Sequence, residues 1–268
     1  MIAPGRARRP GAFLQAIDEP TPDELETCPF CAGREDRTPP QTLVLPETGP
    51  WTVRVVPNLY PALERQEVVV HSPRHVRTFA ELEGRELELT AEAWRRRFEA
   101  AAGEGFPYVH AMVNEGRAAG ASLAHSHSQL VWLREPPPAV ARESASAGCA
   151  VCELIRRDGH EFASEGDVVA VCHPVGRSPF ELLIAPRAHD PVVADDFAAA
   201  LRLLREAVRR LHALEGAIPW NAWLHVGAHW HLEVLPKLTV FAGLELGAEL
   251  YVNVVEPQRA AAALRDVR

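Results

Sequence analysis

Two histidines one residue apart are the feature of this sequence that points most directly to chemistry. His125 and His127 lie in the segment Gly120–Leu130, which continues into the apolar run Leu130–Leu133 and is expected to be a strand. Side chains alternate along a strand, so His125, His127 and Gln129 are predicted to share one face. A nucleophile, a metal ligand and an amide donor can then converge on one small volume. The alternative is a set of polar surface residues beside a turn.

Four of the five cysteines form two Cys-x-x-Cys pairs, and each pair is followed far downstream by histidines. Two such pairs favour tetrahedral zinc, and zinc with four protein ligands is structural because no position is left for water. A redox dithiol is the alternative for a single pair. The first predicted ligand set is Cys28, Cys31, His75 and one of His125 or His127. The second is Cys149, Cys152, His189 and one of His229 or His231.

A neutral imidazole can also attack phosphorus and form a covalent intermediate that divides one displacement into two. Such a site needs a defined histidine tautomer and donors for the phosphate oxygens. Arg6 and Arg9 are the nearest cationic clamp, although they also fit a solvated basic tail. The candidate phosphate donors are Gln129, Ser122, Asn114 and the backbone of the loop that contains Gly116 and Gly120.

The surrounding elements repeat in one order: a cysteine pair, two strands, a Pro-Arg segment ending in histidine, a long helix, a strand, a glycine turn, His-x-His and a strand. This order predicts an α+β fold made of two duplicated halves, each an antiparallel sheet with a packed helix. The long helices are predicted over Leu82–Ala102 and Asp195–Glu215. The predicted strands are Thr52–Val56, Val68–Val70, Tyr108–Val113, Leu130–Leu133, Val168–Val171, Phe180–Ile184, Trp220–Val226 and His229–Leu235.

The halves are predicted as domains over residues 1–138 and 139–268. Pro136–Pro138 begins a stiff segment followed by small residues, which is typical of a linker. Residues 1–27 are Pro-rich and charged and are predicted to form an extended arm.

Composition narrows the class of protein. The 268 residues are 47% hydrophobic and 24% charged, which is ordinary for a globular protein with a sizeable core. A net charge of -8 argues against a broad nucleic-acid footprint. The first 13 residues lack the apolar core of a signal peptide, and no run reaches the length of a membrane span. We therefore expect a cytoplasmic protein.

At these motifs the sequence resembles the histidine-triad superfamily, and within it the galactose-1-phosphate uridylyltransferase family. The matching segments are Arg6-x-x-Arg9-Pro10, Cys28-Pro29-Phe30-Cys31, Pro57-Asn58-x-Tyr60-Pro61-Ala62-Leu63, Ser72-Pro73-x-His75, Asn114-x-Gly116, Gly120-x-Ser122-x-x-His125-x-His127-x-Gln129, Pro179-Phe180-Glu181, Pro186-x-x-His189, His229-x-His231 and Gly243-x-Glu245.

The resemblance implies that His127 attacks the α-phosphorus of a nucleoside diphosphate sugar, while His125 completes the first zinc site. It implies that Gln129 holds a phosphoryl oxygen, that Asn58 contacts the nucleoside, and that Glu245 lies near the sugar. It also implies a homodimer that holds one or two zinc ions, with His229 completing the second site.

Two departures from the family pattern bear on the substrate. Leu59 stands where an acidic residue often follows the nucleoside-binding asparagine, which leaves adenine open beside uridine. Ser128 replaces the usual glycine.

Three functions remain open from the sequence. The first is a nucleotidyltransferase that exchanges a nucleoside monophosphate between a nucleoside diphosphate sugar and a sugar 1-phosphate by ping-pong kinetics. The second is a phosphorylase or hydrolase of ADP-glucose or dinucleoside polyphosphates. The third is a zinc-stapled nucleotide-binding module without activity.

Overall fold

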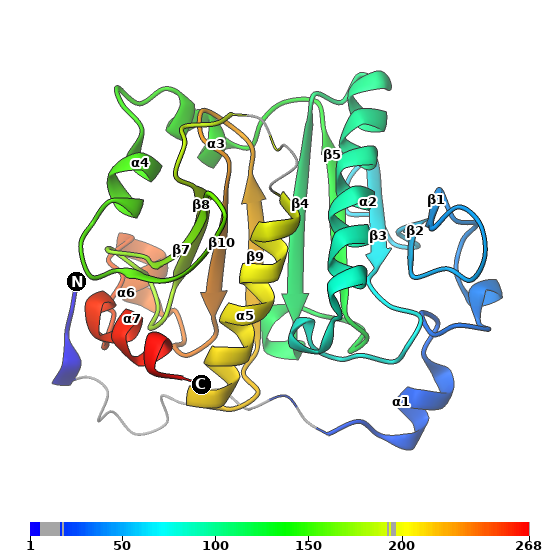
Figure 1. Ribbon diagram of the computed structural model, residues 1–268, viewed down its shortest axis with the longest axis horizontal. Helices are drawn as coiled ribbons and strands as arrows, with labels where there is room; N and C mark the ends of the chain where they lie inside the picture. The colour runs from blue at the N-terminus through cyan, green and yellow to red at the C-terminus, as the bar shows by residue number, and fades with distance from the viewer. Residues whose placement is uncertain (6–16, 18, 192, 194–196, 268) are drawn as a thin grey trace.

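The protein is built on one ten-stranded antiparallel sheet (Figure 1). The computed structural model describes residues 1–5, 17, 19–191, 193 and 197–267. The strands follow one another across the sheet in the order β1-β2-β3-β5-β4-β9-β10-β8-β7-β6. Their bounds are β1 Leu43–Leu45, β2 Val53–Pro57, β3 Arg65–Val70, β4 Tyr108–Glu115, β5 His127–Leu133, β6 Glu161–Glu165, β7 Val168–Cys172, β8 Leu182–Pro186, β9 Trp220–His225 and β10 His231–Pro236.

Each half of the chain contributes five neighbouring strands, and the two sets meet where β4 pairs with β9. Outward from this junction the first half reads β4-β5-β3-β2-β1 and the second β9-β10-β8-β7-β6, so both halves have the same internal order. At the junction Met112 pairs with Trp223 and Asn114 pairs with Asn221. The predicted α+β fold with two duplicated halves is confirmed.

Two long helices, α2 (Gly84–Gly103) and α5 (Phe197–Glu215), cover one face of the sheet (Figure 1). Both were predicted, and the structure places them within two residues of the expected bounds. Helix α5 buries Leu201, Leu204 and Leu211 at helical spacing, and Trp94 of α2 packs on Phe197 with ring centroids 5.4 Å apart. The main hydrophobic core lies between these helices and the sheet.

The opposite face of the sheet carries the cysteine motifs. Cys28 and Phe30 pack on Val56, Val68 and Val70, which alternate with the core-facing residues of β2 and β3. In the second half, Cys149 is the N-cap of α4 (Ala150–Ile155), which packs on β7 and β8. The chemistry therefore lies on the face that α2 and α5 leave uncovered.

The structure corrects two predictions about connecting segments. Residues 22–27 form the helix α1 (Pro22–Thr27), because Thr21 caps its N-terminus and Pro22 suits its first turn. The predicted linker contains α3 (Pro138–Ser144), which is held in place because Val140 is buried.

Several shorter helices of the described residues were not predicted either. They include α6 (Gly243–Ala248), α7 (Pro257–Asp266) and the 3-10 helices η2 (Glu35–Arg37), η3 (Phe79–Glu81) and η4 (Arg117–Ala119).

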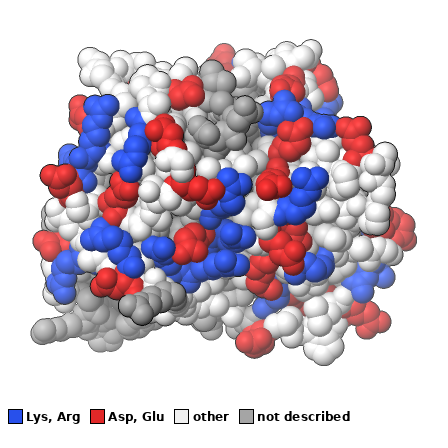
Figure 2. All heavy atoms as spheres, viewed as in Figure 1, with Lys and Arg blue, Asp and Glu red and all other residues white. Residues whose placement is uncertain are grey.

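Charged side chains of both signs are interleaved over the face formed by α2 and α5 (Figure 2). On α2, Arg95 pairs with Glu92 and Glu99, and on α5 Arg210 pairs with Glu206. Among the described residues, no helix combines the length and apolar content that crossing a bilayer requires.

Candidate active site and metal centres

His127 is the first residue of β5, where it pairs with Val70 of β3. Its Nδ1 lies 2.8 Å from the backbone oxygen of His125. Because a carbonyl oxygen only accepts hydrogen bonds, Nδ1 carries the proton and Nε2 keeps its lone pair. Burial lowers the pKa of His127, which favours the neutral ring. The side chain thus has the tautomer and charge state of a nucleophile.

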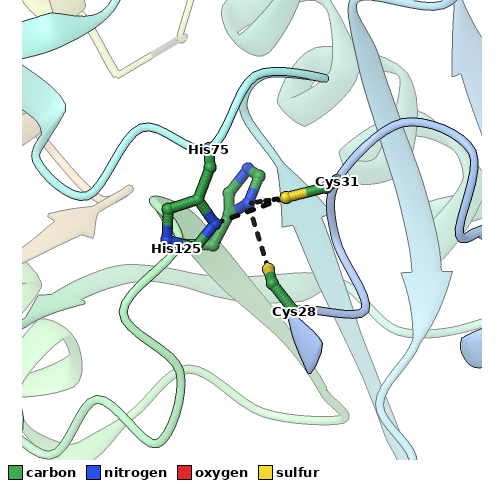
Figure 3. A group of neighbouring side chains, drawn as sticks. All are labelled: Cys28, Cys31, His75 and His125. Atoms are coloured by element: carbon green, nitrogen blue, oxygen red, sulfur yellow. Dashed lines mark hydrogen bonds between the residues drawn. The ribbon is translucent and has the colours of Figure 1, made fainter. Parts of the chain in front are cut away.

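His125, Cys28, Cys31 and His75 converge on one point (Figure 3). His125 Nδ1 lies 3.4 Å from Cys28 Sγ and 3.7 Å from Cys31 Sγ, and His75 Nδ1 lies 3.3 Å from Cys31 Sγ. Tetrahedral zinc with ordinary Zn–S and Zn–N bonds separates neighbouring sulfur and nitrogen ligands by about 3.6 Å. The four ligand atoms therefore fit a zinc ion with little rearrangement.

Hydrogen bonds on the far side of each imidazole orient this cluster. His125 Nε2 donates to the backbone oxygen of Ser72 at 3.0 Å, and His75 Nε2 lies 2.9 Å from a Glu24 carboxylate oxygen. Both contacts leave Nδ1 as the metal-facing nitrogen. Burial, together with the neighbouring Cys28, raises the pKa of Cys31 to about 11, so two thiolates at this point require a bound cation.

A second cluster repeats these contacts in the other half. His229 Nδ1 lies 3.4 Å from both Cys149 Sγ and Cys152 Sγ, and His189 Nδ1 lies 3.5 Å from Cys152 Sγ. His229 Nε2 donates to the backbone oxygen of Pro186 at 2.9 Å, as His125 does to Ser72. The duplication thus extends to individual hydrogen bonds.

The two histidines of each His-x-His motif have different surroundings. His125 and His229 join the cysteines, whereas His127 and His231 stay outside the cysteine clusters. Their Nδ1 atoms face the backbone oxygens two residues earlier, of His125 and His229. By position, His125 and His229 are therefore the members of the two His-x-His pairs that can complete the ligand sets.

A small cavity opens beside His127, and Asn114 and Gly116 also line it. Asn114 lies near the end of β4, and the loop that follows turns at Gly116 and Gly120 with φ values of 83° and 90°. A Cβ at Gly116 would lie 2.9 Å from the side chain of Pro219, so both the backbone conformation and the space require glycine there.

The other predicted substrate residues are distributed over more than one region. Gln129 follows His127 on the same face of β5, and Ser122 is exposed on the loop between β4 and β5. Asn58 follows β2 and accepts a hydrogen bond from the backbone N–H of Tyr60. Glu245 caps α6 in the second half, away from β5 (Figure 1). Arg6 and Arg9 lie outside the described residues.

A third cluster was not predicted. It comprises Glu143, His225, His231 and Glu233, whose ligand atoms lie within 4.8 Å of one another, so they too can hold a cation. Glu143 lies on α3, in the segment predicted as a linker, and its carboxylate is 2.9 Å from His225 Nδ1. His231 and Glu233 lie two residues apart on β10, whereas His225 and Glu143 come from β9 and α3 and belong to no motif.

Comparison with known proteins agrees with this architecture. Residues 61–137 match the sequence profile of the galactose-1-phosphate uridyl transferase N-terminal domain. An ADP-glucose phosphorylase from Arabidopsis thaliana is 28% identical over all of this chain and 89% of its own length. The chain is therefore similar, over most of its length, to the galactose-1-phosphate uridylyltransferase family.

Two further comparisons extend this similarity. The galactose-1-phosphate uridylyltransferase of Thermotoga maritima is 23% identical over 89% of each chain. The crystal structure of the Arabidopsis thaliana ADP-glucose phosphorylase with bound ADP-glucose superposes with a TM-score of 0.84 at 26% identity. It covers 100% of this chain and 95% of its own. The solved structure therefore agrees with the sequence comparison in its likeness to ADP-glucose phosphorylase.

Proposed function

We propose that this enzyme transfers the adenylyl group of ADP-glucose to a phosphate acceptor through a covalent adenylyl-His127 intermediate. The observation that carries the proposal is the division between His125 and His127. One histidine faces the cysteines and the other holds a proton on Nδ1, with Nε2 available.

In the first step, His127 Nε2 forms a bond to the α-phosphorus and the bond from that phosphorus to the bridging oxygen breaks. Glucose 1-phosphate leaves with the electron pair. The backbone oxygen of His125 keeps accepting from Nδ1–H, which stabilises the positive charge that develops on the ring. In the second step, a phosphate oxygen attacks the same phosphorus and the P–N bond breaks, which releases ADP and restores neutral His127.

We propose that zinc occupies the Cys28/Cys31/His75/His125 cluster and also the Cys149/Cys152/His189/His229 cluster. Zinc at these positions supplies structural cross-links, since four protein ligands leave no place for water. The first ion would hold the backbone of His125 still and thereby the oxygen that sets the tautomer of His127.

The preference for adenine rests on two observations. The Arabidopsis relatives that match over the full chain act on, or were solved with, ADP-glucose. In this chain Leu59, next to Asn58, is 64% exposed and carries no acid for a base contact. The match to the uridyl transferase profile supports a second candidate, uridylyl transfer between UDP-glucose and a hexose 1-phosphate.

Isotope exchange tests both candidates. Labelled glucose 1-phosphate is incubated with enzyme and either ADP-glucose or UDP-glucose, without other acceptors. Exchange into ADP-glucose supports the proposal, and exchange into UDP-glucose alone supports the second candidate. Absence of exchange with either nucleotide sugar would favour a hydrolase or a binding module.

The His127→Ala variant should lose exchange but keep its fold and zinc content. The matched control is His231→Ala, because His231 occupies the corresponding place in the second half and makes the same Nδ1 contact. Unchanged exchange in His127→Ala would eliminate His127 as the nucleophile.

We also propose that the protein is a homodimer and that it is located in the cytoplasm. Light scattering after gel filtration measures the oligomeric state directly, and a monomer at micromolar concentration would contradict it.

A further inference from the structure

We propose that Gln66 and Asn221 are positioning residues that turn the amide groups of Gln129 and Asn114 so that their NH2 ends face the phosphate. This inference rests on the proposed nucleotidyl transfer and extends it to two residues outside every motif of the family resemblance. It follows from which partners can only donate and which can only accept a hydrogen bond.

The first relay starts at the backbone N–H of Ala62, which donates to Gln66 Oε1 at 2.8 Å. A backbone N–H cannot accept, so this contact determines which end of the Gln66 amide is oxygen. Gln66 Nε2 must then face Gln129, whose Oε1 lies 2.6 Å away. The NH2 group of Gln129 is thereby left on the open side of its amide, on the face of β5 that carries His127.

The second relay starts at the backbone oxygen of Ala119, which lies 2.7 Å from Asn221 Nδ2. A carbonyl oxygen cannot donate, so this end of the Asn221 amide must be its NH2 group. The second hydrogen of the same group reaches Asn114 Oδ1 at 2.7 Å. Asn114 lines the cavity beside His127, and its own NH2 group is turned away from Asn221.

The sheet register explains why these pairs meet. Val68 pairs with Gln129 in the β3–β5 ladder, so Gln66, two residues earlier, lies diagonal to Gln129 on the same face. Asn221 lies directly opposite Asn114 across the β4–β9 junction between the two halves. The second half of the chain therefore orients a donor that belongs to the catalytic half.

The polarity of these amides matters because phosphate oxygens accept hydrogen bonds and do not donate them at neutral pH. An NH2 group aimed at the α-phosphate stabilises the charge that develops during displacement. A reversed amide would present a carbonyl oxygen to the same phosphate and repel it. Gln66 is 8% exposed, so bulk water has little access to replace the relay.

The decisive variant is Gln66→Glu. The introduced carboxylate still accepts from the Ala62 N–H, so the loop contact is retained, but it has no hydrogen to donate to Gln129. Gln129 should then reverse its amide and donate to that carboxylate. We expect exchange activity to fall by about 10-fold or more, the scale associated with loss of one donor at a developing charge.

The added charge of the carboxylate is controlled by a double-mutant cycle with Gln129→Ala. With no amide left to reverse, Gln66→Glu should change activity by less than about twofold in the Gln129→Ala background. A purely electrostatic or structural role would give the same loss in both backgrounds and would overturn the proposal. Methionine in Gln66→Met neither donates a hydrogen bond nor repels the phosphate. The exchange activity of this variant should therefore lie between those of wild type and Gln66→Glu.

Asn221→Asp tests the second relay, with Asn114→Ala as the background. This variant also loses the donor to the backbone oxygen of Ala119, so the part of its loss that Asn114→Ala removes is the measure of the relay. Thermal unfolding and zinc content are measured for every variant, and a variant that unfolds is replaced by its neutral counterpart, Gln66→Met or Asn221→Ala. Calorimetric binding of AMP provides a readout besides activity. Inactive wild-type enzyme would overturn the proposed function. AMP binding unchanged by Gln66→Glu and Asn221→Asp, together with losses of activity that the backgrounds do not remove, would overturn the relays alone.

Discussion

Deprotonation of buried Glu115 should lower the stability of the protein as pH rises toward neutrality. Glu115 ends β4 with only 4% of its surface exposed. Its carboxyl group accepts from the hydroxyl of Thr78, the backbone N–H of Phe79 and Nε1 of Trp220. Burial outweighs these donors and raises the pKa of Glu115 to about 7.

The direction of the effect follows from proton linkage. The folded pKa of about 7 exceeds the unfolded value of 4.5, so the folded state binds more protons between these values. The associated stability is fully present below the unfolded pKa and is lost as pH rises through the folded pKa. Linkage gives a loss of about 2.5 kcal/mol in the free energy of unfolding between pH 5 and pH 8.

Urea denaturation at a series of pH values measures this loss against the variant Glu115→Gln. The amide of the variant cannot titrate, so the difference in unfolding free energy between the two proteins should change by about 2.5 kcal/mol over that range. Glu88→Gln, on the exposed side of α2, is the control and should leave the pH profile unchanged. Parallel profiles for wild type and Glu115→Gln would refute the assignment of a raised pKa to Glu115.

Three further substitutions test other parts of the structure. Trp94→Phe removes the indole N–H that donates to Ser128 Oγ at 2.9 Å inside the core, and should lower the unfolding free energy by about 1–3 kcal/mol in denaturant titrations. Gly116→Ala should cost about 1–3 kcal/mol in the same experiment, because an added Cβ meets a proline side chain at a φ of 83°. Gly103→Ala, where nothing lies within 4 Å, is its control and should be neutral or stabilising. Cys149→Ser should halve the zinc measured by mass spectrometry and lower the melting temperature while isotope exchange continues. Loss of exchange in Cys149→Ser would instead assign the second site a direct part in turnover.

The sequence predicted the parts of the site that belong to local patterns. Alternation along a strand and the spacing of cysteines indicated both Cys/His clusters, and the duplicated order of elements predicted the fold. The separate tasks of His125 and His127 came from the family resemblance, because a strand segment read alone places both side chains on one face. In the structure, Nδ1 of His125 lies beside Cys28 Sγ, whereas Nδ1 of His127 donates to the backbone oxygen of His125.

Other parts of the site depend on contacts between distant segments. Gln66 and Asn221 lie in strands without any motif, and they acquire a role only through the register that sets them beside Gln129 and Asn114. Glu143 was not predicted because a Pro-rich start followed by small residues is typical of a linker. In the structure, burial of Val140 anchors the helix that carries Glu143.

The central claim is that His127 becomes covalently adenylylated, and intact-protein mass spectrometry tests it most directly. Wild-type enzyme incubated with ADP-glucose in the absence of phosphate should gain the mass of one adenylyl group, and addition of phosphate should remove it. His231→Ala should gain the same mass and His127→Ala should gain none. An adduct that persists in His127→Ala, or that maps to another residue in wild type, would contradict the account.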